Sequence, residues 1–186
     1  MYIFYSSRGV IMVFARTWSE ELVAEWLTAS DYAVLVGVPV GTGKRGGRKE
    51  ADVVGFKSEE TGVRIVHFEI SHIWESAGKV VERIDNKFSS DRVEYIRQYV
   101  ASITGSSNII YEKHAIVFAS RGVLEKVKEI LRGKGIRVWS FQEFFNTQVL
   151  PIVREKSKKG RTFPDSLWLL NMLRILCSEK LLSKCT

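Results

Sequence analysis

Two acidic residues interrupt two neighbouring apolar segments of the chain. Asp52 lies early in "ADVVGFK" (51–57), and Glu69 lies late in "GVRIVHFEIS" (62–71). Both segments are rich in β-branched residues, and the connection around "KSEETG" is short, so the sequence predicts two strands that pair antiparallel. This pairing places Asp52 and Glu69 near the same end of a sheet, and the register decides whether they share a face.

Carboxylates in an apolar setting need a positive partner. An unpaired buried carboxylate is strongly destabilising, and two together repel, which raises the pKa of one of them. A divalent cation would relieve the repulsion, and oxygen-only ligands suit Mg²⁺ or Mn²⁺. In the alternative interpretation, each acid is a structural ion-pair partner of a nearby lysine or arginine.

His67 and Ser71 share the predicted strand face of Glu69, because alternate residues of a strand point the same way. If this face lines a site, His67 could act as a base or a ligand. A lone histidine is more often a satisfied or exposed side chain, and that interpretation stays open beside the first.

The remaining chain supplies the elements that must position these residues. A helix is predicted over 17–30, with Thr17 and Glu20 as a capping box, and a strand over 32–40. After the two acidic strands we expect a helix over 91–103, a strand over 113–120, a helix over 122–132, a strand over 136–141 and a helical segment over 141–150. An exposed basic connection follows Pro151, and a last helix begins near Pro164. This order predicts an α/β protein with a mixed sheet and helices on both faces.

Length and composition indicate the number of domains, the kind of partner and the location of the protein. We expect 186 residues to form a single domain, with 1–16 as an N-terminal extension that adds a strand, 17–150 as the core and 151–186 as a basic linker and C-terminal helix. The excess of 28 basic over 21 acidic residues, +7, favours a polyanionic partner. Two cysteines without metal-site spacing fit a reducing, cytoplasmic location. No apolar run reaches the roughly 20 residues of a membrane span, so no membrane partner is expected.

The glycine-rich segment "GTGKRG" (41–46) has the letters of a dinucleotide-binding loop. Such a loop must open a helix, whose N-terminal amides face the phosphates, but here the next segment is a predicted strand. The segment is therefore interpreted as a turn that carries four cations: Lys44, Arg45, Arg48 and Lys49. These side chains could contact a phosphate backbone, or the turn could be a solvated hairpin tip.

Three segments carry a resemblance to a known family. "SEELVAEWL" (19–27), "KEADVVGF" (49–56) and "IVHFEIS" (65–71) resemble the first helix, the aspartate strand and the ExK strand of the PD-(D/E)XK nuclease superfamily. Within it, the Holliday-junction-resolvase-like members are the most similar. The motifs cover residues 17–71, and the later helix and strand match by order only. The resemblance implies a restriction-endonuclease-like α-β-β-β-α-β core, here with an extra C-terminal helix.

The same resemblance implies a set of site residues. Asp52 and Glu69 would hold Mg²⁺ or Mn²⁺ together with the backbone carbonyl of Ile70. Glu20 would orient a water at the metal or hold a second ion, although its place in the capping box is an equally good explanation. Ser71 stands where the family has a lysine, and a serine can orient water but cannot neutralise negative charge.

A lysine from another part of the chain could supply the positive charge that the motif lysine would provide at position 71. Lys49, Lys57 and Lys113 are the candidates, and the sequence does not rank them.

The implied activity is a metal-dependent endonuclease that acts on duplex or branched DNA. Ser71 favours a second hypothesis, a catalytically impaired nuclease-fold protein that binds DNA, and a third is an assembly protein in which the acidic pair is structural. The leucines of the last helix could cover the sheet or form a homodimer contact. The aromatic tract 139–145 could stack on bases, although core packing is the more common role of such residues.

Overall fold

The computed structural model describes residues 3–6, 9–12, 17–40, 50–72 and 75–179. Its centre is a five-stranded sheet with the strand order β3-β4-β5-β6-β7. The strands are β3 (Ala33–Pro39), β4 (Glu50–Glu59), β5 (Gly62–Ser71), β6 (Ile109–Val117) and β7 (Ile136–Ser140). The first three are antiparallel neighbours, and β6 and β7 continue the sheet parallel to β5. The predicted mixed α/β sheet is confirmed.

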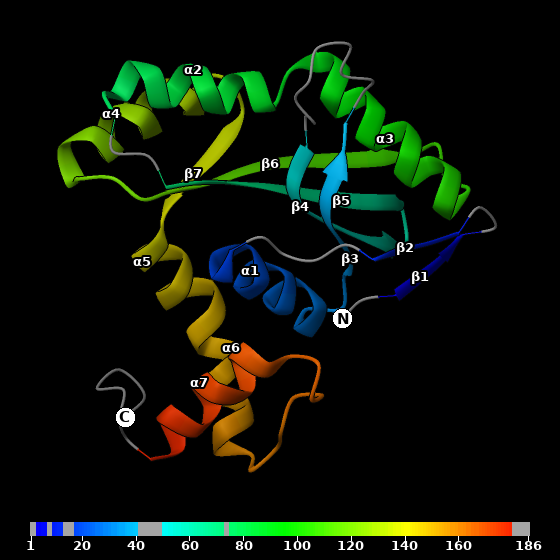
Figure 1. Ribbon diagram of the computed structural model, residues 1–186, viewed down its shortest axis with the longest axis vertical. Helices are drawn as coiled ribbons and strands as arrows, with labels where there is room; N and C mark the ends of the chain where they lie inside the picture. The colour runs from blue at the N-terminus through cyan, green and yellow to red at the C-terminus, as the bar shows by residue number, and fades with distance from the viewer. Residues whose placement is uncertain (1–2, 7–8, 13–16, 41–49, 73–74, 180–186) are drawn as a thin grey trace.

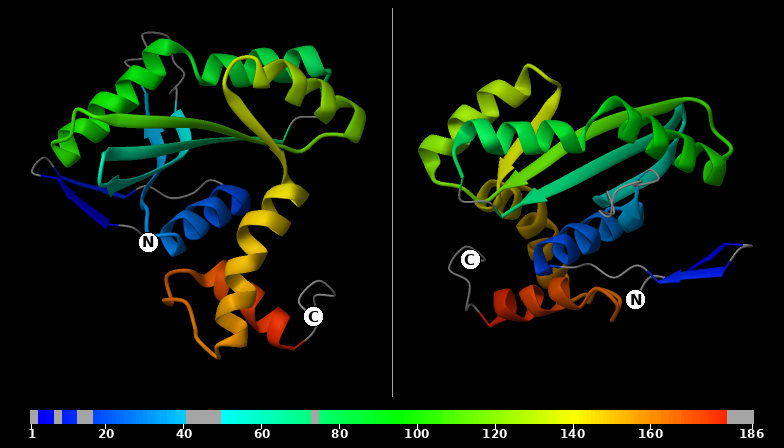
Figure 2. Two further views of the ribbon diagram at one scale, coloured as in Figure 1. Left: turned by 180° about the vertical axis from the view of Figure 1, so that it is seen from behind. Right: turned by 45° about the horizontal axis from the view of Figure 1, so that its top comes forward.

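Helices cover both faces of this sheet (Figure 1). They are α1 (Trp18–Ala29), α2 (Ala77–Lys87), α3 (Ser90–Thr104), α4 (Arg121–Arg132), α5 (Phe141–Phe144), the π-helix η1 (Phe145–Val149), α6 (Leu150–Lys158) and α7 (Trp168–Ser178). Figure 2 shows from two further sides that α2, α3 and α4 lie on one face, with α1 and the C-terminal helices on the other. No helix among the described residues has both the length and the apolarity to cross a bilayer.

The tight hairpin between β4 and β5 sets the register of the acidic strands. Gly62, which pairs with Glu59 at the turn, has φ +142°, and a Cβ on it would collide with the backbone carbonyl of Asn108. From this turn the pairing runs without a bulge to Val53 opposite Phe68. Asp52 and Glu69 are the next positions along the two strands, as the sequence predicts.

Helix α1 packs on the face of the sheet that carries Val53 and Phe68, in one core cluster with Leu22 and Leu27. Gly55 permits this close packing, because a Cβ at that position would lie 3.0 Å from the Leu27 methyl groups. Since strand residues alternate between faces, Asp52 and Glu69 point to the opposite face, which α2 and α3 cover.

Two predictions about helices are wrong. Helix α2 was not expected, although Val80, Val81 and Ile84 form its buried side. The segment after Pro151 was expected to be an exposed connection, but α6 continues through it to Lys158. Proline is tolerated there because it stands at the second position of α6, directly after the wide π-turn of η1, where its missing N–H removes no ordinary helix bond.

The two ends of the chain also differ in part from expectation. Where one extra strand was expected, the N-terminal extension forms two, β1 (Ile3–Ser6) and β2 (Gly9–Met12), which pair in a two-stranded sheet of their own. Strand β6 starts at Ile109, before the predicted 113, because its β-branched start lies opposite Val63 of β5. Helix α7 begins at Trp168 rather than near Pro164, and it packs on α1 and α6 rather than on the sheet.

A buried carboxylate joins α7 to α1. Glu25 is fully buried, and its two oxygens accept the backbone N–H groups of Leu169 at 2.9 Å and Leu170 at 2.8 Å. These N–H groups belong to the first turn of α7 and have no partner within that helix. Burial raises the pKa of Glu25 to about 6, although the backbone N–H donors act in the opposite direction.

Replacing Glu25 by alanine tests this junction. The Glu25→Ala variant leaves two buried N–H groups without an acceptor, so we expect its free energy of unfolding to fall by about 2 kcal/mol in urea denaturation. Glu21→Ala, one turn earlier on α1 and only half-buried, is the matched control and should change stability little. Equal losses in the two variants would contradict the assigned role of Glu25.

Candidate active site

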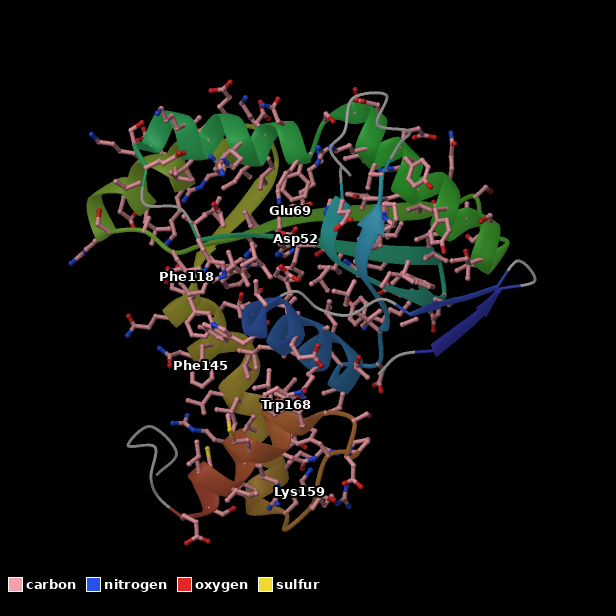
Figure 3. All side chains as sticks on the ribbon, in the orientation of Figure 1. Asp52, Glu69, Phe118, Phe145, Lys159 and Trp168 are labelled. Atoms are coloured by element: carbon pink, nitrogen blue, oxygen red, sulfur yellow. The ribbon has the colours of Figure 1, made fainter. Side chains whose placement is uncertain are left out.

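Lys87 joins the two acidic residues of the adjoining strands. Its ammonium group donates to Asp52 Oδ1 at 3.0 Å, to Asp52 Oδ2 at 2.9 Å, and to Glu69 Oε2. Figure 3 shows Asp52 and Glu69 close together. The two carboxylates therefore share one face and one cation, and neither is paired with an arginine of its own among the described residues.

The sequence of α2 explains how Lys87 reaches the sheet. Val80, Ile84 and Lys87 follow one another at helical spacing, so all three lie on the same side of the helix. The first two are buried against the sheet, and the Lys87 side chain is 27% exposed. Lys87 thus stands at the buried side of the last turn, directly above the acidic pair.

Asp52 is held by the neighbouring strand as well as by Lys87. Its Oδ2 accepts the backbone N–H of Ile70 at 2.7 Å, and only 17% of its side chain is exposed. Burial raises the pKa of Asp52 to about 6, and the nearby Glu69 adds to this, while Lys87 and the Ile70 N–H act against it. Asp52 therefore changes its charge close to neutral pH.

Glu69 is oriented by a chain of buried hydrogen bonds. Its Oε1 lies 2.8 Å from His67 Nε2, and His67 Nδ1 lies 2.8 Å from the Tyr111 hydroxyl. Burial lowers the pKa of His67 to about 3, so the ring is neutral and carries one N–H. This N–H donates to the Glu69 carboxylate while Tyr111 donates to Nδ1. His67 is thus a satisfied buried histidine that positions Glu69.

The cluster holds more negative than positive charge. Burial raises the pKa of Glu69, and Lys87 offsets this only in part. Burial also acts to lower the pKa of Lys87, but Glu69 and Asp52 overcome this and the net shift is upward. One ammonium group against two carboxylates leaves an excess negative charge when both acids are ionised, and a proton or a further cation would neutralise it.

A pocket of about 220 Å³ opens beside the cluster at the end of β5. It is lined by Glu69, Ile70, Ser71, His72, Arg83, Ile84 and Lys87. The Ser71 hydroxyl is buried and has no hydrogen-bond partner among the residues that the structure describes. A small polar ligand or a water in this pocket would meet Glu69 and Lys87 together.

The other predicted site residues lie apart from this cluster or outside the described residues. Glu20 is in the first turn of α1, its backbone N–H donates to Thr17 Oγ1 at 3.3 Å, and α1 covers the opposite face of the sheet. The cap by Thr17 is confirmed, and a role of Glu20 at a metal stays a prediction. The loop cations Lys44, Arg45, Arg48 and Lys49 all lie outside the described residues.

Lys57 and Lys113 were two candidates for the lysine that the motif lacks at Ser71, and neither contacts the acidic pair. Lys57 lies over the ring of Tyr32 at 4.5 Å, and Lys113 stands opposite His67 on β6, without a bond to either carboxylate. Lys87 was missed because α2 was missed. A lysine at the third position after a buried isoleucine of an amphipathic helix is the signal that could have identified it.

Carboxylate and carbonyl oxygens are the ligands that hard divalent cations prefer. Asp52 and Glu69 provide carboxylate oxygens, and the Ile70 carbonyl lies on the same strand end. No group of three or more His, Cys, Asp and Glu side chains suited to a metal occurs in the described part of the chain. Mg²⁺ is nevertheless commonly bound by one or two carboxylates, with waters and substrate phosphates completing the shell.

Comparisons with protein-family models, curated proteins and solved structures find no significant match to this chain. The interpretation of the site therefore depends on its residues and geometry. These place Asp52, Glu69 and Ser71 together at one end of the sheet and add Lys87 to them.

Replacing Lys87 tests the electrostatics of the cluster. Lys87→Met keeps the aliphatic stem but leaves two buried carboxylates without their cation, so we expect the free energy of unfolding to fall by about 3 kcal/mol at neutral pH. The loss of the ammonium raises both folded-state pKa values further above their unfolded values. The deficit is therefore largest at high pH and disappears as the pH falls below the ordinary carboxylate range.

Urea denaturation at several pH values measures this effect. Lys79→Met, on the exposed side of the same helix, is the matched control and should show little deficit at any pH. A Lys87→Met deficit that does not vary with pH would mean that Lys87 contributes packing rather than charge.

Proposed function

We propose that this protein is a metal-dependent endonuclease of the PD-(D/E)XK type, which hydrolyses phosphodiester bonds in duplex or branched DNA. The observation that supports it most is the convergence of Asp52, Glu69 and Lys87 at one end of the sheet. These are the residue types that the family resemblance requires, and they contact one another although they come from three separate elements.

The order of elements supports the same proposal. Helix α1, the antiparallel strands β3, β4 and β5, the helices α2 and α3, and the parallel strand β6 follow the α-β-β-β-α-β order that the resemblance implies. Lys87 provides the positive charge that Ser71 lacks. The departure from the motif is thereby compensated by a side chain that reaches the same two acids from α2.

Each residue of the cluster has a role in this chemistry. A Mg²⁺ or Mn²⁺ ion held by Asp52, Glu69 and the Ile70 carbonyl would polarise the scissile phosphate and lower the pKa of an attacking water. The Ile70 N–H and His67 hold the two carboxylates in fixed orientations. The Lys87 ammonium stabilises the negative charge that develops on the phosphate oxygens.

The surroundings of the cluster agree with a nucleic-acid substrate. Ser71 lines the pocket beside Glu69, and its buried hydroxyl has no hydrogen-bond partner among the described residues. The net charge of +7 favours attraction to DNA, and the four cations of the loop 41–49 would add contacts to its backbone. The proposal relies on no contact of Glu20, which lies on α1 at the opposite face of the sheet.

One observation favours the rival function, a nuclease-fold protein that binds DNA without cutting it. Lys87 already bonds to both oxygens of Asp52 and to one of Glu69, so a metal ion must displace these bonds to enter. If the ammonium is a permanent substitute for the metal, the cluster is structural and the basic surface alone binds DNA.

Cleavage assays distinguish these functions. We expect the wild-type protein to cleave supercoiled plasmid or four-way-junction DNA with Mg²⁺ or Mn²⁺, and not with a chelator. Asp52→Ala and Glu69→Ala should abolish cleavage, and Lys87→Ala should slow it by roughly 10²–10³-fold. Lys79→Ala on the same helix should cut normally. Binding without cleavage under all metal conditions would favour the rival.

The pH dependence of metal binding gives a second test. Because the pKa of Asp52 is raised to about 6, its carboxyl is mostly protonated below that pH and competes poorly for a cation. We expect Mn²⁺ affinity, measured by titration calorimetry, to rise steeply as the pH increases through 6 and to level off above it. Asp52→Asn, which cannot ionise, should remove most of this dependence, and an equally steep curve in that variant would contradict the assignment.

A further inference from the structure

A row of aromatic rings begins at the wall of the pocket. His72 stacks on Phe118 with ring centroids 4.2 Å apart, Phe118 stacks on Phe141 at 5.2 Å, and Phe141 stacks on Phe145 at 5.9 Å. Successive ring planes differ by only 22°, 20° and 27°. Figure 3 shows Phe118 and Phe145 one below the other, along the helical segment formed by α5 and η1.

Trp18 completes this row at its side. Its ring meets Phe118 and Phe141 edge to face, with centroids 6.1 and 5.1 Å apart, yet 52% of the residue is exposed. His72 is exposed and the three phenylalanines are half-buried, whereas Trp139 and Phe144 of the same aromatic tract are buried in the core. The tract 139–145 therefore contributes buried side chains to the core and partly exposed rings to the surface.

The row is continuous with the candidate active site. His72 lines the pocket together with Glu69 and Lys87, and it is also the first ring of the row. Its Nε2 lies 2.8 Å from Ser19 Oγ, which fixes the orientation of the ring at the pocket wall. The pocket and the aromatic row therefore share one residue, His72.

We propose that the aromatic row, formed by His72, Phe118, Phe141 and Phe145 with Trp18 at its side, is a stacking platform for the bases of an unpaired DNA strand. This inference rests on the proposed function and narrows its substrate to DNA with a single-stranded segment beside the scissile phosphate. In a continuous duplex the faces of the bases are covered by their neighbours. In an unpaired strand the bases are free to stack on aromatic side chains, whatever the base sequence.

Charge near the row fits this occupant better than another protein. Arg121, at the start of α4 shortly after Phe118, is exposed and forms no ion pair within the described residues. The whole chain carries +7. A surface that combines the exposed rings of Trp18 and His72 with an unpaired arginine suits a strand of bases joined by phosphates.

Binding without cleavage tests the platform directly. Fluorescence anisotropy in the presence of a chelator would compare a labelled oligothymidine of about 15 nucleotides, a duplex of that length and an abasic strand of that length. We expect the wild-type protein to prefer oligothymidine, and Trp18→Ala to weaken its binding roughly tenfold. The abasic strand should bind the wild-type protein as weakly as oligothymidine binds the variant, and Trp18→Ala should not weaken abasic binding further.

The chain offers a matched control for this experiment. Trp168, the first residue of α7, is 53% exposed, nearly the same as Trp18, but takes no part in the aromatic row. Trp168→Ala should bind all three probes like the wild type. His72→Ala removes the ring at the pocket wall and should also weaken oligothymidine binding, and circular dichroism melts of each variant verify that it is folded.

The outcomes separate the platform from the nuclease. Oligothymidine binding that is unaffected by both Trp18→Ala and His72→Ala overturns the platform, even if the protein cleaves DNA. Equal losses from Trp18→Ala and Trp168→Ala, or wild-type affinity for the abasic strand equal to that for oligothymidine, overturn it as well. Base-dependent binding that Trp18→Ala removes supports the platform, and absence of cleavage in the same preparation would then count against the nuclease alone.

Discussion

The ammonium group of Lys87 holds two carboxylates together on one face of the sheet, and neighbouring elements position all three groups. Asp52 and Glu69 stand on adjoining antiparallel strands, where they would repel without Lys87. The hairpin turn at Gly62 fixes their register, the Ile70 N–H and His67 fix their orientations, and α2 delivers the lysine. The excess negative charge that remains is the basis of the proposal that a divalent cation binds here.

The parts of the fold that depend on local sequence patterns could be predicted. Strands β4 and β5 were found from their β-branched residues and short turn, and with them the placement of Asp52 beside Glu69. Helix α2 has a local signal in the helical spacing of Val80, Ile84 and Lys87, which was missed. The contact of Lys87 with the two carboxylates could not be derived in the same way, because it joins distant elements and no local pattern specifies it. The π-turn before Pro151 is a second example, since a wide helical turn has no simple sequence signature.

The site and the aromatic row differ in how they treat groups that are unfavourable on their own, namely buried polar groups without partners and apolar surface exposed to water. The buried polar groups of the site are connected to one another, from Tyr111 through His67 and Glu69 to Lys87. Trp18, in contrast, keeps half of its large apolar surface exposed, although the core lies close by. The first pattern gives a rigid centre, and the second leaves a surface on which the proposed substrate can lie.

The contact of Glu25 with the first turn of α7 bears on where this domain ends. A chain cut before Trp168 would lose both N–H donors to the buried carboxylate of Glu25. The buried side of α1 would then carry a carboxylate without hydrogen-bond donors. The same helix α1 carries Trp18 and Ser19 at its other end, next to His72. The C-terminal helix is thus an integral part of the globular unit rather than a detachable appendage.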